Sequence, residues 1–203
     1  MNGKHNPLPV PPDLLLTEAE VKALVKRFMT KVGARVREFR TMQGLTLAKL
    51  HNDYKINVSQ TSRIENGKQN LTLWTAVRFA YVLGVRPWDF YVPRERAPSL
   101  KPKHRKRPPP TKPMLKEATV EFRQQVARRI RSLCELQGIS RAGLHEFSGV
   151  CSETLIAIDT ATANIRASTA VRIADAIGVH TYELYIPSEL SGIQPRVNTA
   201  QEP

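Results

Sequence analysis

The sequence has no long hydrophobic run and only two cysteines among its 203 residues. No apolar segment approaches the roughly 18 residues that a membrane-spanning helix needs, and the N-terminus lacks the charged and then apolar pattern of a secretory signal. Cys134 and Cys151 form no CxxC pair and have no histidine cluster nearby, so neither a zinc site nor a disulfide framework is indicated. We therefore expect free thiols, no metal and a cytoplasmic location.

Patterns that indicate catalysis are also missing. The sequence contains no glycine-rich phosphate-binding loop of either common type. His51 and His145 stand near apolar residues, without a paired carboxylate, a nucleophile or metal-ligand spacing around them. We therefore expect structural roles for both histidines, no cofactor, and a protein that is not an enzyme.

Acidic residues are few. The sequence has 18 Asp and Glu against 31 Lys and Arg, which gives a net charge of +13. Residues 29–93 carry ten basic and four acidic side chains, and residues 94–119 carry nine and two. Residues 120–187, in contrast, balance at seven of each. Such clustering favours a phosphate backbone as the partner. A membrane surface would instead call for a basic amphipathic helix, which the proline-rich residues 101–110 cannot form.

A short polar helix is predicted within residues 57–67. Asn57 is suited to cap its first turn, and Asn66 and Gly67 are suited to end it, because both tolerate positive φ. A second short helix is expected just upstream, from Thr46 to about Asp53, across a tight turn. Two short helices in this order form a helix-turn-helix, whose second helix lies in the DNA major groove.

Further landmarks surround these two helices at fixed spacing. They are Val32, Gly33, Arg35, Val36, Arg37, Arg40, Gly44, Leu45, Thr46, Leu50, Ile64, Glu65, Asn66, Gly67, Lys68, Ala80, Leu83, Gly84 and Val85. Through these residues the chain resembles the Cro and phage-repressor family of transcriptional regulators, also called XRE. The resemblance implies a five-helix domain like that of λ repressor, and a buried ion pair between Arg40 and Glu65 that ties the first helix to the recognition helix.

The sequence repeats itself at an offset of 94 residues without a gap. Gly44 matches Gly138, and Leu50 matches Leu144. The expected fold is therefore all-α, with two λ-repressor-like five-helix helix-turn-helix domains in tandem. The predicted organisation is a flexible proline-rich leader (1–16), an N-terminal DNA-binding domain (17–93), a basic proline-rich linker (94–113), a C-terminal helix-turn-helix-like domain (114–187) and a flexible tail (188–203).

The first long helix is expected to start near Glu18. Thr17 and Glu20 are spaced as a capping box, and apolar residues follow at helical spacing. The sequence leaves open whether this helix continues into the next apolar segment or breaks near residues 30–33.

Three groups of residues are candidates for DNA contacts. The candidates for reading base edges lie on the outward face of the recognition helix, and they are Val58, Ser59, Gln60 and Arg63. The candidates for phosphate contacts are Thr46, Asn57, Ser62, Asn66, Lys68, Gln69 and Asn70. A basic arm is formed by Lys101, Lys103, Arg105, Lys106 and Arg107, with a solvated spacer as the alternative.

The second copy has diverged at the positions that matter for DNA. Cys134 and Asp159 stand where the first copy has Arg40 and Glu65, so the expected ion pair is lost. Its recognition helix would expose Ser152, Glu153, Thr154 and Ile156. The negative charge of Glu153 and the apolar residues of this helix favour a protein partner over phosphates. We therefore expect the second domain to serve assembly of a homodimer, with a monomer that uses both of its own domains as the alternative.

These observations predict a sequence-specific regulator of transcription that binds double-stranded DNA. The resemblance favours a bacterial or phage repressor over an activator, associated with the nucleoid when bound to DNA. Two alternatives stay open. One is the antitoxin of a toxin-antitoxin pair, and the other is a protein-interaction adaptor built from degenerate helix-turn-helix domains.

Overall fold

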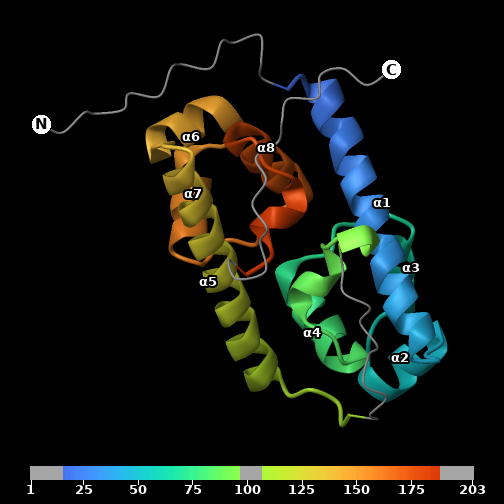
Figure 1. Ribbon diagram of the computed structural model, residues 1–203. Helices are drawn as coiled ribbons and strands as arrows, with labels where there is room; N and C mark the ends of the chain where they lie inside the picture. The colour runs from blue at the N-terminus through green and yellow to red at the C-terminus, as the bar shows by residue number, and fades with distance from the viewer. Residues whose placement is uncertain (1–15, 97–106, 188–203) are drawn as a thin grey trace, which may run out of the picture.

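The computed structural model describes residues 16–96 and 107–187, and within these ranges it contains eight α-helices, short 3₁₀ turns and no strand (Figure 1). The all-α prediction is confirmed. None of the helices in these ranges is long and apolar enough to cross a membrane.

Helix α1 (Glu18–Met42) begins at the predicted capping box. The side chain of Thr17 accepts a hydrogen bond from the Glu20 amide, and the Glu20 carboxylate accepts one from the Thr17 amide in return. The helix then continues without interruption through residues 30–33. Of the two possibilities that the sequence left open, the unbroken helix is correct.

The rest of the first half is made of short helices, each of which begins at a capping residue. Thr46 caps α2 (Leu47–Tyr54), Asn57 caps α3 (Val58–Glu65), and Thr72 caps α4 (Leu73–Leu83). In each case the side-chain oxygen accepts a hydrogen bond from an amide of the first turn. Two 3₁₀ turns follow, η2 (Pro87–Phe90) and η3 (Arg94–Arg96).

The second half repeats this order of elements. It consists of α5 (Lys112–Leu136), α6 (Arg141–Ser148), α7 (Ser152–Asp159), α8 (Ala167–Ile177) and the 3₁₀ turn η4 (Thr181–Leu184). Each of these elements begins 94 residues after its counterpart in the first half, as the duplication predicts. Helix α5 thus starts two residues before the expected boundary at residue 114.

Each of the two long helices packs both on its own half of the chain and on the other half. Helix α1 packs on α3 and η2 of its own half and also on α8 of the other half. Helix α5 makes the equivalent contacts, packing on α7 and η4 and on α4 of the first half. Figure 1 shows α1 running past α8 and α5 running past α4. Each long helix is therefore shared between the two halves of the chain.

Aromatic side chains from both halves meet where the halves join. The rings of Tyr91 and Tyr185 stack with centroids 3.9 Å apart and an interplanar angle of 4°. Phe28 contacts both of these rings, and Phe122 contacts Tyr91. The buried side chains of the two halves accordingly form one continuous hydrophobic core.

Candidate nucleic-acid interface

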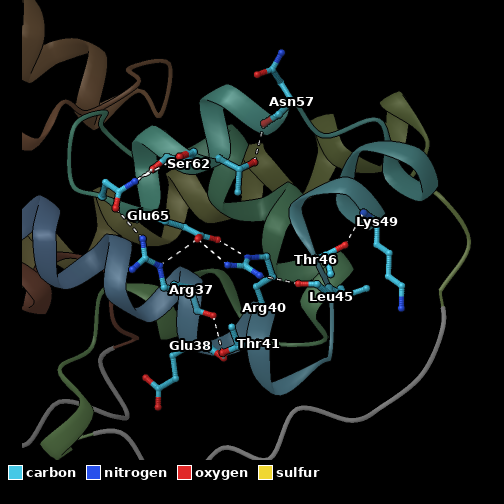
Figure 2. Close-up of polar contacts among 12 residues, drawn as sticks. Arg37, Glu38, Arg40, Thr41, Leu45, Thr46, Lys49, Asn57, Ser62 and Glu65 are labelled. Carbon is cyan, nitrogen blue, oxygen red and sulfur yellow. Dashed lines mark hydrogen bonds and ion pairs between the residues drawn. The ribbon is translucent and has the colours of Figure 1, made fainter.

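Helix α3 is fixed to α1 by a cluster of charged side chains (Figure 2). Nε of Arg40 donates to Oε1 of Glu65 at 2.6 Å, and Nη2 donates to Oε2 at 2.8 Å. The Glu65 side chain is only 3% exposed and the Arg40 side chain 12%. The hydrogen bond to Glu65 raises the pKa of the Arg40 guanidinium. The buried pair implied by the family resemblance is confirmed.

The cluster is larger than the pair that the resemblance implies. Arg37 donates to Oε2 of Glu65 at 3.3 Å and to Oδ1 of Asn66 at 2.8 Å. Nη1 of Arg40 also donates to the carbonyl oxygen of Leu45 at 2.7 Å. Arg40 therefore connects α1 both to α3 and to the segment that leads into α2, which fixes the position of α3 relative to the rest of the first half.

The approach of α1 to α3 is close enough to require glycine at two positions. A Cβ atom on Gly33 would lie 2.2 Å from the carbonyl oxygen of Ile64. Gly67 follows α3 with φ of +65°, and a Cβ atom there would lie 2.9 Å from Cα of Thr30. Any larger residue at either position would push α3 away from α1.

The turn between α2 and α3 is held by side chains from the helices around it. Lys55 ends α2 in the left-handed conformation with φ of 56°. Nη2 of Arg78, on α4, donates to the carbonyl oxygens of Tyr54 and Lys55. Nδ1 of His51 lies 3.3 Å from the carbonyl oxygen of Ile56, which can only accept. His145 makes the equivalent contact to Val150 at 2.7 Å, so each histidine contacts the backbone that follows its own helix.

The candidates for reading bases lie on the outer side of α3. Val58 is 39% exposed, Ser59 and Arg63 are exposed, and Gln60 is half-buried. The inner side of the helix carries Thr61 and Ile64, which are fully buried in the core. The side chains of Ser59 and Arg63 have no hydrogen-bond or ion-pair partner among residues 16–96 and 107–187. Their polar groups are free to bind a ligand outside the protein.

The candidates for phosphate contacts fall into two kinds. Some already have an intramolecular role: Thr46 and Asn57 cap helices, and the Asn66 amide donates to Ser62 as well as accepting from Arg37. Lys68, Gln69 and Asn70 follow the C-terminal end of α3, where Lys68 is exposed and the other two are half-buried. Of the candidates for phosphate contacts, Lys68 alone carries a charge.

The structure also shows cations near α3 that were not among the expected contacts. Lys49, Lys55 and Arg37 are exposed on the elements around α3. The duplication carries a signal for two of them, because the equivalent residues in the second half are Gly143 for Lys49 and Gly149 for Lys55. Arg63 and Lys68 are likewise replaced, by Ala157 and Thr162. Four cations of the first unit thus have uncharged counterparts in the second.

Of the predicted basic arm, only Arg107 belongs to the described residues. Lys101, Lys103, Arg105 and Lys106 lie outside them. Arg107 contacts the first half directly: Nη1 donates to the carbonyl oxygen of Tyr81 at 3.1 Å, and the guanidinium lies over the ring of that tyrosine. Arg107 is therefore bound to the folded protein.

The second half has no equivalent of the Arg40–Glu65 pair among its described residues, and Asp159, which stands in place of Glu65, pairs with another residue. Asp159, at the end of α7, pairs with Arg141 of α6 at 2.5 Å, whereas Leu47 is the equivalent of Arg141 in the first half. Cys134, which stands in place of Arg40, is half-buried. Burial raises the pKa of its thiol to about 11, and the nearby charge of Asp159 acts in the same direction. Cys134 is thus a neutral packing residue at physiological pH.

Helix α7 exposes a mixed surface. Ser152 and Glu153 are exposed, Thr154 is half-buried, and Ile156 is 47% exposed. Leu155 belongs to the core instead, with 3% exposure. The apolar surface of this helix is therefore smaller than its sequence suggests.

Comparisons with known proteins do not add to this picture. No family model, no curated protein and no solved structure matches the chain. Within the described ranges, no group of three or more potential ligands is placed to hold a metal ion. The case for a function therefore rests on the geometry of the α2–α3 region.

Proposed function

We propose that this protein is a sequence-specific, double-stranded-DNA-binding regulator of transcription with α3 as its recognition helix. The observation that carries the proposal is the outer side of α3, where Ser59 and Arg63 are exposed and have no partner within the described residues. The Arg40–Glu65 pair ties this helix to α1. A hydrogen-bonding helix surface of this size fits a major groove, where Arg reads guanine and Ser reads several bases. Repression by occupying a promoter is the proposed mode of action.

Charge supports phosphate binding around this helix. Lys49, Lys55 and Lys68 are exposed next to α3, and they supply the sequence-independent part of the affinity. The second half lacks all three cations and places Glu153 where the first has Ser59. The first half is therefore the main reader of DNA in this proposal, and the two units are proposed to be λ-repressor-like helix-turn-helix domains.

The sharing of the long helices between the halves favours one chain as the binding unit. In a symmetric dimer, two chains would bring two recognition helices together across a two-fold axis. Here α1 with α8 and α5 with α4 make paired contacts within one chain, and equivalent tyrosines stack at their centre. We propose that a single chain presents α3 and α7 to one operator with two unlike half-sites. The homodimer expected from the sequence stays the competing prediction.

The role of α7 in this proposal is a second, weaker DNA contact. Ser152 and Thr154 offer hydroxyl groups, and Glu153 can accept a hydrogen bond from a cytosine amino group. Ile156 is exposed enough to contact a thymine methyl group. Assembly through this surface is the alternative role.

The experiment that tests the proposal is selection of bound fragments from genomic DNA, followed by titration of the selected site. Arg63→Ala should weaken binding to that site by about 1 to 3 kcal/mol and relax one base position. Arg128→Ala is the matched control, because Arg128 is an exposed arginine on α5. Equal losses on selected and random DNA would contradict base reading by Arg63.

The stoichiometry separates one chain from two. The mass of the protein in solution at micromolar concentration, and of its complex with the selected site, should correspond to one chain. Two chains per site would restore the homodimer. An adaptor would bind no duplex in a salt-dependent way, and an antitoxin would be encoded beside a small toxin gene.

A further inference from the structure

The structure contains a cavity between the two halves that the proposed DNA contacts do not use. Its volume is about 670 Å³, within the range of sites for small organic molecules. One wall is α1, the opposite wall is α8 with the segment that leads into η4, and residues 90–96 close one side. Both halves of the chain therefore contribute to a single site.

The walls combine apolar and cationic groups. The apolar part is formed by Leu24 and Phe28 of α1, facing Val171 and Val179 of the second half. The cations are Arg27, Lys31, Arg35, Arg94 and Arg96, against the carboxylates of Glu38, Glu95 and Asp175. The cations thus outnumber the acids along the lining.

Three of the cations lie at helical spacing along α1. Arg27, Lys31 and Arg35 are four residues apart, so their side chains follow one face of the helix. Arg27 and Lys31 are exposed and have no hydrogen-bond or ion-pair partner in the described part of the chain. Arg35 is only 8% exposed, and its Nη1 donates to Oε2 of Glu38.

The cationic lining is not a general consequence of the duplicated fold. The equivalents of Arg27 and Lys31 on α5 are Glu121 and Gln125, and the Gln125 amide donates to the carbonyl oxygen of Tyr185. The equivalent of Asp175 is Tyr81, whose ring is covered by Arg107. Arg27 and Lys31 therefore have no cationic equivalents at the matching positions of α5.

We propose that this cavity binds an organic anion with an apolar body. The apolar body packs between Phe28 and Val171, and the anionic group accepts hydrogen bonds from Arg27 and Lys31. Because the walls come from opposite halves, the ligand stabilises their packing against each other. This site is separate from α3, so its existence does not depend on DNA binding.

The test is a fluorescence titration of the full chain with 1-anilinonaphthalene-8-sulfonate, alongside its uncharged analogue N-phenyl-1-naphthylamine. One sulfonate should bind per chain, and a saturating concentration should raise the melting temperature. Arg27→Ala with Lys31→Ala should weaken sulfonate binding by about tenfold or more, through the loss of charge-assisted hydrogen bonds. Binding of the uncharged probe should stay the same.

Two further variants complete the design. Lys22→Ala with Lys26→Ala removes the same charge from exposed positions of α1 outside the lining, and it should leave sulfonate binding unchanged. Ala34→Trp adds a large side chain at an exposed position of the lining and should block both probes. Equal losses in the two double variants, or full binding to Ala34→Trp, would overturn the proposal.

Discussion

Tyr91 and Tyr185, which stand 94 residues apart in the sequence, stack face to face at the centre of the molecule with ring centroids 3.9 Å apart. They are equivalent residues of the two copies, so the two copies contact each other through equivalent positions. Both rings are buried, and the hydroxyl of Tyr91 donates to the carbonyl oxygen of Leu71 at 3.2 Å. The contact gives the chain the character of a dimer folded within one polypeptide.

The tyrosine pair predicts a loss of stability at alkaline pH. Burial raises the pKa of both phenols above the ordinary value of 10.0, and the negative charge of an ionised Tyr185 further raises the pKa of Tyr91. Above about pH 10 the unfolded state therefore releases its phenolic protons first, so the free energy of unfolding falls as the pH rises. Below that pH both states keep these protons and the pair adds no pH dependence.

Urea denaturation at a series of pH values checks this. The double change Tyr91→Phe and Tyr185→Phe should make the alkaline fall shallower. It should also cost about 1 kcal/mol at neutral pH, because the Leu71 carbonyl loses its donor. An alkaline fall of undiminished steepness in the double variant would show that other groups cause it.

The Arg40–Glu65 pair predicts a difference between single and double substitutions. Arg40→Met leaves Glu65 buried with Arg37 as its remaining partner, so we expect a loss at the lower end of the roughly 3 to 5 kcal/mol typical of a broken buried pair. Arg40→Met combined with Glu65→Leu removes both charges and should cost less. Chemical denaturation of the single and the double variant measures this difference, and equal losses in the two would contradict the expectation.

The equivalent positions Ser59 and Glu153 predict opposite responses to exchange. Ser59→Glu places a negative charge on the outer side of α3, and a repulsion of about 1 kcal/mol from each nearby phosphate would weaken DNA binding at least fivefold. Glu153→Ser removes the matching repulsion at α7 and should strengthen binding. Titrations at two salt concentrations measure both effects. No change on Glu153→Ser would mean that α7 does not approach the DNA.

The basic arm predicts a change in salt dependence. Neutralising Lys101, Lys103, Arg105 and Lys106 should weaken binding to every duplex and lower the slope of log K against log salt by up to about 0.9 for each phosphate that the arm no longer neutralises. Arg107→Ala should act differently, because this arginine lies on Tyr81. Its main effect should be a loss of stability of about 0.5 to 1 kcal/mol. An unchanged slope in the fourfold variant would reduce the arm to a spacer.

Local structure was largely determined by the sequence itself. Thr17, Thr46 and Asn57 are expected from the sequence to open helices, and they do so. A cap of this kind joins a side-chain oxygen to an amide three residues further along the chain, so it depends on local sequence alone. The offset of 94 residues predicted every element of the second half for the same reason: similar local sequences form similar local structure. The Arg40–Glu65 contact needed the family resemblance in addition.

The tertiary structure decided how these elements combine. Helical periodicity shows that α1 has an apolar face, but not that the N-terminal part of this face packs on α8 of the other copy, since the pattern does not name its partner. Leu155 and Ile156 are adjacent and equally apolar in the sequence, yet one is buried and the other is 47% exposed. The cavity beside Phe28 likewise depends on residues about 150 positions apart, which the shared long helices bring together. Packing between distant segments, which follows from the shape of the whole core, made these choices.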